Sequence, residues 1–210
     1  HPQSPFGEAM HAAFSKAIEA RGATLVSTVA YPPTTSSFVK EAQQLEHTAF
    51  DALVLLDAPS KVALIAPTLA ARGMWSVAPG TEPPEGHAVL YVVPAAGFDP
   101  SLATSTRRYL QGALFSVPFD PADAPAFTAA YREKFQTEPN LFSALGSDAY
   151  QLIEAALASG ASTREELARA LPKTRLEHPA ATGSGFAESR GPREPGRLKT
   201  LLGGAFVQTN

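Results

Sequence analysis

One carboxylate in this sequence stands where a bound solute could be recognised. Asp57 directly follows the apolar run Asp51 to Leu56 and precedes a segment with helical periodicity. In an open α/β sheet, ligands gather outside the carboxyl ends of the strands. Asp57 and the nearby Ser60 are therefore candidate ligand-binding residues. The simpler alternative for Asp57 is that its side chain caps the helix that begins at Pro59.

Two aromatic residues belong to the same predicted edge. The loops Pro5 to Gly7 and Tyr31 to Thr35 also connect a predicted strand to a predicted helix. By the same geometry, Phe6 and Tyr31 would form the aromatic lining of the site. The alternative for each aromatic side chain is plain packing in the core.

Signatures of catalysis are missing from the sequence. There is no Gly-x-Ser-x-Gly turn, no Gly-x-x-x-x-Gly-Lys phosphate loop and no Gly-x-Gly-x-x-Gly fingerprint. Ser184, between two glycines, lies in an irregular segment with no strand before it. The five histidines show no convincing metal-ligand spacing. We therefore predict a protein that is not an enzyme and that needs neither a cofactor nor a metal.

Composition excludes further classes of function. The 210 residues include no cysteine, which removes disulfides, thiolate metal sites and thiol nucleophiles. A net charge of −3 gives no general attraction to nucleic acid or to an anionic membrane. No apolar run approaches the roughly 20 residues that a membrane span needs, so no direct membrane insertion is expected. The opening residues His1 to Pro5 are typical of a loop interior, and we expect a longer precursor.

The first 95 or so residues alternate predicted helices and strands. Helices are expected at 7–21, 37–47 and 59–72, and strands at 23–30, 51–56, 75–78 and 87–93. The continuous apolar run of residues 51–56 is typical of a strand covered on both faces. This order predicts an α/β fold with a doubly wound, mostly parallel sheet flanked by helices.

The second half is predicted to be mainly helical. After a short helix within 98–110 and a strand at 113–117, a helix capped by Asp120 is expected, followed by one at 142–159. Ser162 to Glu165 reads as a capping box for a last helix. Residues 172–196 are expected to form a loop with a short hairpin at Gly185-Phe186, and residues 198–207 return to strand character.

The order of these pieces resembles the type I periplasmic binding proteins for leucine, isoleucine and valine. Shared features include an aromatic-Gly-acidic helix start at Phe6 and a Phe-x-x-x-Tyr helix followed by proline. The resembling segments are Pro5 to Met10, Glu19 to Ala23, Tyr31-Pro32 with Ser37-Phe38, Phe50 to Val54, the series Phe127, Tyr131, Phe135 and Pro139, Ser147 to Tyr150, Gly185-Phe186 and Gly204 to Val207.

The resemblance implies a bilobed clamp of which most of the first lobe is missing. Residues 1–117 would be the second lobe, with a hinge near Ser116 to Phe119. Residues 118–210 would be a helical crossover segment and a C-terminal strand that returns to the second lobe. Family members carry about a hundred further residues, including a strand immediately before the position of His1. In the family, the helices of the crossover segment cover the first lobe. Without that lobe they would expose their apolar faces.

The resemblance also implies a function and a location. It indicates an extracytoplasmic or periplasmic solute-binding component of an ABC-type uptake system, working with a membrane permease and lipid-anchored through a missing N-terminus. The stretch Pro94 to Phe98, where amino-acid binders of the family carry a carboxylate, has no charge here. The expected ligand is an amino acid, an amide or another small apolar molecule, and an α-amino acid is the less favoured of these because an unpaired ammonium would be costly there. The alternative is an envelope interaction module with a degenerate cleft, similar to lipoprotein activators of penicillin-binding proteins.

Overall fold

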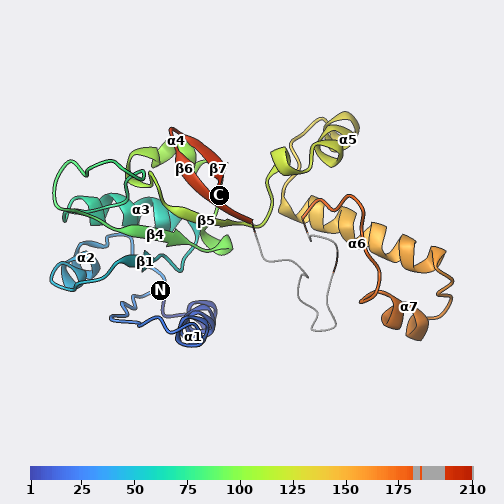
Figure 1. Cartoon of the computed structure of the whole chain (residues 1–210), viewed down its shortest axis with the longest axis horizontal. Coiled ribbons are helices and arrows are strands. Elements are labelled where there is room, and N and C mark those ends of the chain that lie inside the picture. The colour runs from blue at the N-terminus through green and yellow to red at the C-terminus, as the bar shows by residue number, and fades with distance from the viewer. Residues whose placement is uncertain (182–184, 186–196, 210) are drawn as a thin grey trace. The chain divides into compact units, whose positions relative to one another are not determined.

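The chain divides into two compact units. A computed structural model describes residues 1–181, 185 and 197–209. The first unit contains His1–Val117 and Leu198–Asn210, and the second contains Pro118–Arg197. In Figure 1 the first unit runs from blue to green and closes with the red C-terminal strands.

A five-stranded sheet forms the centre of the first unit. Its order is β1-β4-β5-β6-β7, and β1 pairs with β4 and β4 with β5 in parallel. The strands are β1 (Ala52–Val54), β4 (Leu90–Val93), β5 (Leu114–Val117), β6 (Arg197–Leu202) and β7 (Ala205–Gln208). The β6–β7 pair is an antiparallel hairpin, and β2 (Met74–Trp75) and β3 (His87–Ala88) form a separate parallel pair.

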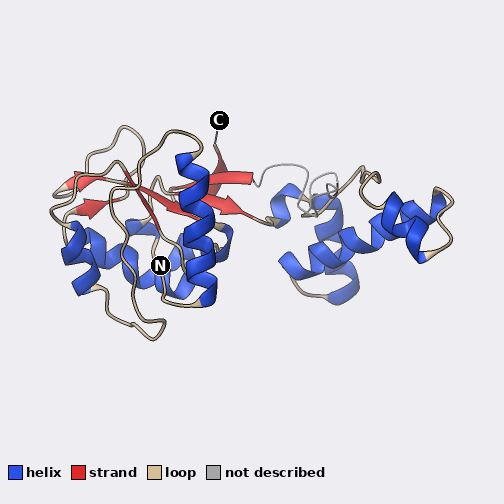
Figure 2. Cartoon of the chain, turned by 90° about the horizontal axis from the view of Figure 1, so that it is seen from below, coloured by secondary structure: helices blue, strands red, loops and turns tan. Residues whose placement is uncertain are grey.

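Helices lie alongside this sheet (Figure 2). They are α1 (Pro5–Glu19), α2 (Val39–Leu45), α3 (Pro59–Ala70) and the short α4 (Leu102–Ser105), with 3₁₀ turns at Ala95–Gly97 and Arg107–Tyr109. Helix α3 buries Val62, Ala66 and Leu69 on one face because these residues recur at helical spacing. The predicted α/β class, with a mostly parallel sheet flanked by helices, is confirmed.

Aromatic packing ties the C-terminal hairpin to the sheet. The Phe206 ring lies 4.9 Å from the Phe115 ring and 5.0 Å from the Phe98 ring, both in edge-to-face arrangements. Leu201 of β6 is fully buried in the same core. Residues after Leu198 therefore belong to the first unit although 80 residues of the second unit, Pro118–Arg197, precede them.

The second unit is helical in its described part. It contains a 3₁₀ turn (Pro121–Asp123), α5 (Pro125–Phe135), α6 (Leu141–Ala158) and α7 (Arg164–Ala170). Asp120 caps the 3₁₀ turn through the Ala122 N–H, whereas α5 begins only at Pro125, so the predicted helix start was wrong.

Two features of the second unit differ from or extend the sequence predictions. The capping box pairs Thr163 with Glu166, one residue later than predicted, because Glu166 occupies the third helical position of α7. Asp148, fully buried in α6, accepts hydrogen bonds from the N–H groups of Ala180 (2.7 Å) and Ala181 (2.8 Å). This carboxylate therefore holds the chain beyond α7 against the middle of α6.

Residues 23–30 do not form the predicted strand. They follow Gly22, which has a left-handed backbone (φ 75°), but none belongs to a strand of the described chain. An isolated parallel bridge links Pro2 to Tyr31 just after this segment. A strand needs a neighbour that accepts and donates its backbone hydrogen bonds, and composition alone does not supply one. The predicted hairpin at Gly185-Phe186 falls outside the described residues at Phe186.

Candidate functional site

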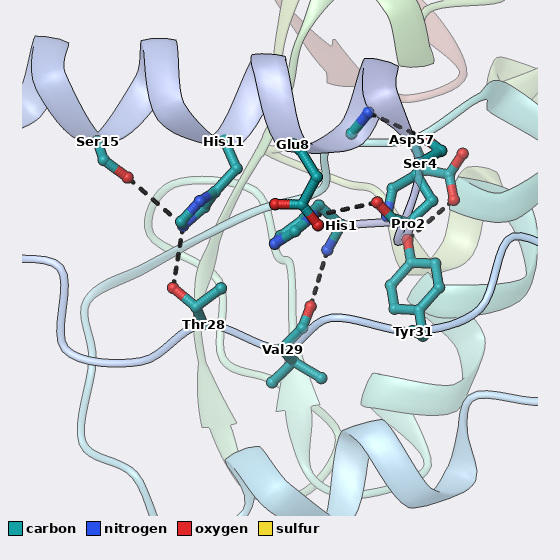
Figure 3. Close-up of polar contacts among 11 residues, drawn as sticks. His1, Pro2, Ser4, Glu8, His11, Ser15, Thr28, Val29, Tyr31 and Asp57 are labelled. Carbon is teal, nitrogen blue, oxygen red and sulfur yellow. Dashed lines mark hydrogen bonds and ion pairs between the residues drawn. The ribbon is translucent and has the colours of Figure 1, made fainter.

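The candidate site centres on a hydrogen bond between two buried side chains. Tyr31 directly follows residues 23–30, and its hydroxyl group donates a hydrogen bond to Asp57 Oδ2 over 2.9 Å. The second carboxylate oxygen of Asp57, Oδ1, accepts from the Ala58 N–H at 2.7 Å. Tyr31 is 4% exposed and Asp57 is 9% exposed. Figure 3 shows the phenol pointing directly at the carboxylate.

The turn Pro94–Phe98 is a third segment of the site, and it packs against the backbone of Asp57. Asp57 follows β1, and the turn Pro94–Phe98 follows β4, which pairs with β1 in parallel. Gly97 packs so closely that a Cβ there would lie 2.8 Å from the Asp57 carbonyl oxygen. The site therefore lies at the carboxyl ends of β1 and β4, where open α/β sheets bind ligands. Any side chain larger than hydrogen at Gly97 would displace the Asp57 backbone.

The other two predicted site residues are accessible. Phe6 lies in the first turn of α1 and is 53% exposed, and Ser60 is exposed in the first turn of α3. Phe6 is therefore not a core residue, whereas Tyr31 packs edge-to-face against Phe38 in the core. No hydrogen bond among the described residues joins Phe6 or Ser60 to the Tyr31–Asp57 pair. The ligand-binding role of all four residues stays a prediction.

The capping alternative for Asp57 does not hold in the structure. The N-cap position of α3 is Ala58, and no side chain caps this helix end. Asp57 instead uses one oxygen for Tyr31 and the other for the adjacent backbone. Its carboxylate still lies at the N-terminal end of α3, where the helix dipole favours negative charge.

Burial and charge act together on the Tyr31 phenol. Burial raises the pKa of Tyr31 well above its ordinary value, and the hydrogen bond to Asp57 and the negative charges of Asp57 and Glu41 raise it further. Tyr31 is therefore a hydrogen-bond donor at every physiological pH. It holds one oxygen of Asp57, so a ligand group that approaches Asp57 must share or displace this bond.

Sequence reasoning missed two groups around the pair. Lys61, half-buried in α3, donates a short hydrogen bond to the carbonyl oxygen of Thr35 and so ties the Tyr31 loop to α3. One carboxylate oxygen of Glu41 is buried with no hydrogen-bond partner among the described residues. Apolar spacing along α2 gave no reason to single out Glu41, because it lies between the inward positions.

A cavity of about 610 Å³ lies in the first unit. Its lining is mainly apolar and includes the whole of residues 23–29 and 49–56, together with Tyr31 and Glu41. His1 and His11 also line this cavity, and their rings stack with centroids 4.6 Å apart (Figure 3). No cluster of metal-ligating side chains occurs among the described residues. Within that part of the chain, no helix has the length and apolarity that crossing a membrane requires.

Several solved structures have the same fold as this chain. Over 99% of its length, the chain resembles the leucine-binding protein of Thermotoga maritima at 19% identity, with a TM-score of 0.74. A solute-binding protein of an ABC transporter from R. palustris, solved with benzoate, is 18% identical over the whole chain, with a TM-score of 0.69. An extracellular ligand-binding receptor from Rhodopseudomonas palustris HaA2 is 18% identical over 99% of the chain, with a TM-score of 0.72.

The chain spans less than two thirds of these structures, namely 57%, 56% and 61% of their lengths. No curated protein sequence matches it. Its sequence does match a family described as periplasmic binding protein, over residues 1–201. The predicted resemblance is confirmed by this match, and the prediction that the chain is not an enzyme agrees with it. The chain belongs to the periplasmic binding protein family, a family of binding proteins and not of enzymes.

Proposed function

We propose that this chain is part of the substrate-binding component of an ABC-type uptake system and that it recognises a small apolar amide. The family match over residues 1–201 supports a solute-binding role in the periplasm. A solved relative of the same fold is the solute-binding protein of an ABC transporter. The predicted lipid anchor has no support from these relatives and stays a prediction.

The observation that carries the ligand chemistry is the Tyr31–Asp57 pair. At the carboxyl ends of β1 and β4, the Asp57 carboxylate and the Tyr31 phenol form a buried hydrogen-bonded pair, and the adjoining turn Pro94–Phe98 has no charge. A carboxylate accepts hydrogen bonds and repels anions, so it favours a ligand with N–H donors. Phe6, exposed at the start of α1, offers an aromatic surface for the apolar part of such a ligand.

A pair of isosteric ligands tests this proposal. Benzamide and benzoate have the same ring and nearly the same shape, but only benzamide has N–H groups to donate to Asp57. We expect isothermal titration of the 210-residue chain to show at least about tenfold tighter binding of benzamide, equivalent to about 1.4 kcal/mol. Leucine, which carries both charges, should bind more weakly than benzamide because Asp57 repels its carboxylate and Lys61 already donates to the Thr35 carbonyl oxygen.

Two aspartates at opposite ends of β1 make matched variants. Asp57→Asn should abolish the preference for benzamide over benzoate, because the amide side chain both donates and accepts. Asp51→Asn, an exposed residue before the strand, removes the same charge and should leave the preference unchanged. Binding of neither compound, or equal effects of the two variants, would contradict the amide proposal.

A non-binding chain would favour the second candidate function, an envelope interaction module. The mutual satisfaction of Tyr31 and Asp57 favours this candidate, because side chains that already pair offer less to a solute. A crystal soaked with benzamide separates the two candidates. Retention of the 2.9 Å bond with no bound amide would support the interaction module.

A further inference from the structure

Arg108 is an exposed arginine whose guanidinium group lies over two aromatic rings. Its Cζ atom is 5.7 Å from the centre of the Trp75 ring and 5.8 Å from the centre of the Tyr109 ring. The two rings lie next to each other, with centroids 5.8 Å apart. Stacking of this kind holds the guanidinium group in place, while the N–H groups at its edge stay available as hydrogen-bond donors.

The charge of Arg108 has no carboxylate partner in the described part of the chain. No ion pair and no side-chain hydrogen bond joins Arg108 to another described residue. By contrast, a carboxylate pairs with each of Arg72, Arg132 and Arg197. Arg108 therefore combines a fixed position with a positive charge that no described acidic residue neutralises.

The same cluster contains a buried donor without an acceptor. Trp75 is 5% exposed, and its indole N–H has no hydrogen-bond partner among the described residues. Buried donors in native proteins are nearly always paired, so an unpaired one marks a place where an acceptor from outside the chain is expected. The Trp75 N–H and the Arg108 guanidinium group both favour a partner that accepts hydrogen bonds, and the charge of Arg108 favours an anionic one.

This cluster lies at the opposite end of the parallel strands from the solute site. The 3₁₀ turn Arg107–Tyr109 precedes β5, whereas Asp57 follows β1, and both strands run parallel to β4. Arg107 is also exposed, and it lies across the turn between β6 and β7, where a Cβ on Gly204 would be 2.9 Å from Arg107 Cδ. Two adjacent arginines are therefore held by their neighbours at a place that the solute site does not use.

We propose that Arg108, Trp75 and Tyr109 form a docking surface for an acidic segment of a partner protein, with a carboxylate of that segment bound to the Arg108 guanidinium group. A carboxylate matches the planar guanidinium group with two parallel hydrogen bonds. Tryptophan, tyrosine and arginine are the residues that most often dominate the energy of protein interfaces. A free small carboxylate would gain little from one exposed ion pair, whereas a protein segment adds contacts around it. This surface does not depend on which solute the chain binds.

The test titrates the 210-residue chain with two synthetic peptides that differ only in charge. The acidic peptide is acetyl-Gly-Glu-Asp-Glu-Gly-amide, and its uncharged counterpart is acetyl-Gly-Gln-Asn-Gln-Gly-amide. Trp75 is the one tryptophan, so its indole N–H gives a single signal in a heteronuclear NMR spectrum of the labelled chain. We expect the acidic peptide to shift this signal saturably and the uncharged peptide to bind at least about tenfold more weakly. Equal effects of the two peptides, or no shift with either, would overturn the proposal.

Two arginines of the first unit make matched variants, because both are exposed and each change removes one charge. Arg108→Gln should weaken binding of the acidic peptide at least about fivefold, as expected for a residue that dominates an interface. Arg21→Gln, just beyond α1, should weaken it by less than about twofold, because salt screens a distant charge. Equal weakening by the two variants would mean a general attraction between charges and would overturn the docking surface.

Sodium acetate at the same carboxylate concentration is the third arm of the test. It should shift the Trp75 signal much less than the acidic peptide does. A shift as large as that caused by the peptide would mean that free carboxylates suffice, and it would overturn the docking of a protein segment. Benzamide takes no part in these titrations, so a chain that fails to bind benzamide still gives a clear answer about Arg108.

Discussion

At the residue scale, the Tyr31 hydroxyl should contribute measurably to the stability of the first unit. Its hydrogen bond satisfies one oxygen of a buried carboxylate, and Tyr31→Phe leaves that oxygen without its donor. We expect the free energy of unfolding to fall by about 1–3 kcal/mol, the cost of an unsatisfied buried acceptor. Urea denaturation followed by the fluorescence of Trp75, the one tryptophan, measures this change.

Tyr150→Phe is the matched control for this loss. Tyr150 is 65% exposed on α6, so its hydroxyl is solvated before and after unfolding. Its removal should change the unfolding free energy by no more than about 0.5 kcal/mol. If Tyr31→Phe were as mild as Tyr150→Phe, water would have to replace the phenol as the partner of Asp57.

Two buried phenols give the first unit a dependence on alkaline pH. Burial raises the pKa of both Tyr31 and Tyr91 above the ordinary tyrosine value, and Asp57 adds to the effect at Tyr31. A raised pKa in the folded state means that the unfolded chain loses these protons first. Stability should therefore be fully present below about pH 10 and should fall as the pH rises further.

The variant Tyr31→Phe shows how much Tyr31 contributes to this loss of stability at alkaline pH. Tyr31→Phe should flatten the fall in unfolding free energy above about pH 10, because one of the two phenols no longer titrates on unfolding. Denaturation midpoints across that pH range provide the measurement. An unchanged slope in the variant would show that Tyr31 titrates freely in the folded protein.

At the element scale, α6 has one packed face and one exposed face. Leu152 is 3% exposed, whereas Phe142, Tyr150 and Leu157 are 80%, 65% and 51% exposed. Leu152→Ala should cost about 2–5 kcal/mol of unfolding free energy, because it opens a cavity in a packed interior. Leu157→Ala makes the same chemical change five residues later and should cost no more than about 0.5 kcal/mol. Denaturation followed by far-UV circular dichroism compares the two, and equal losses would mean that the outer face is covered.

Local patterns predicted the elements whose stability is local. Helix α3 needs only the spacing of Val62, Ile65 and Leu69, and the apolar run before Asp57 identified β1. Residues 23–30 have an equally good strand composition, but a strand forms only where a partner supplies hydrogen bonds. The capping box moved by one residue because Ser162 and Thr163 are both good caps, and the hydroxyl of Thr163 is the one that bonds the Glu166 N–H.

The candidate site could be predicted only in part. The position of Asp57 after a buried strand placed it at the correct sheet edge, since that rule depends on topology alone. The bond from Tyr31 to Asp57 joins residues 26 positions apart, and no periodicity encodes such a contact. The same holds for Lys61 with Thr35, whose pairing depends on how the loop after residue 30 returns to α3.

At the scale of the whole molecule, the two units have separate cores. Buried residues such as Tyr91, Phe115 and Leu201 form one cluster in the first unit, and Phe119, Ala124, Ala144 and Ala180 form another in the second. Trp75 is buried in the first unit, whereas the long helix α6 belongs to the second. Two optical signals therefore report on different units of the same chain.

Because the buried residues form two separate clusters, we expect two unfolding transitions in urea. Trp75 fluorescence should follow the first unit, while far-UV circular dichroism should show an additional change from the helices of the second. Leu152→Ala provides the decisive comparison, because it should lower the midpoint of the circular dichroism transition and leave the fluorescence midpoint in place. A shift of both midpoints by the same amount would mean that the two cores unfold as one cooperative unit.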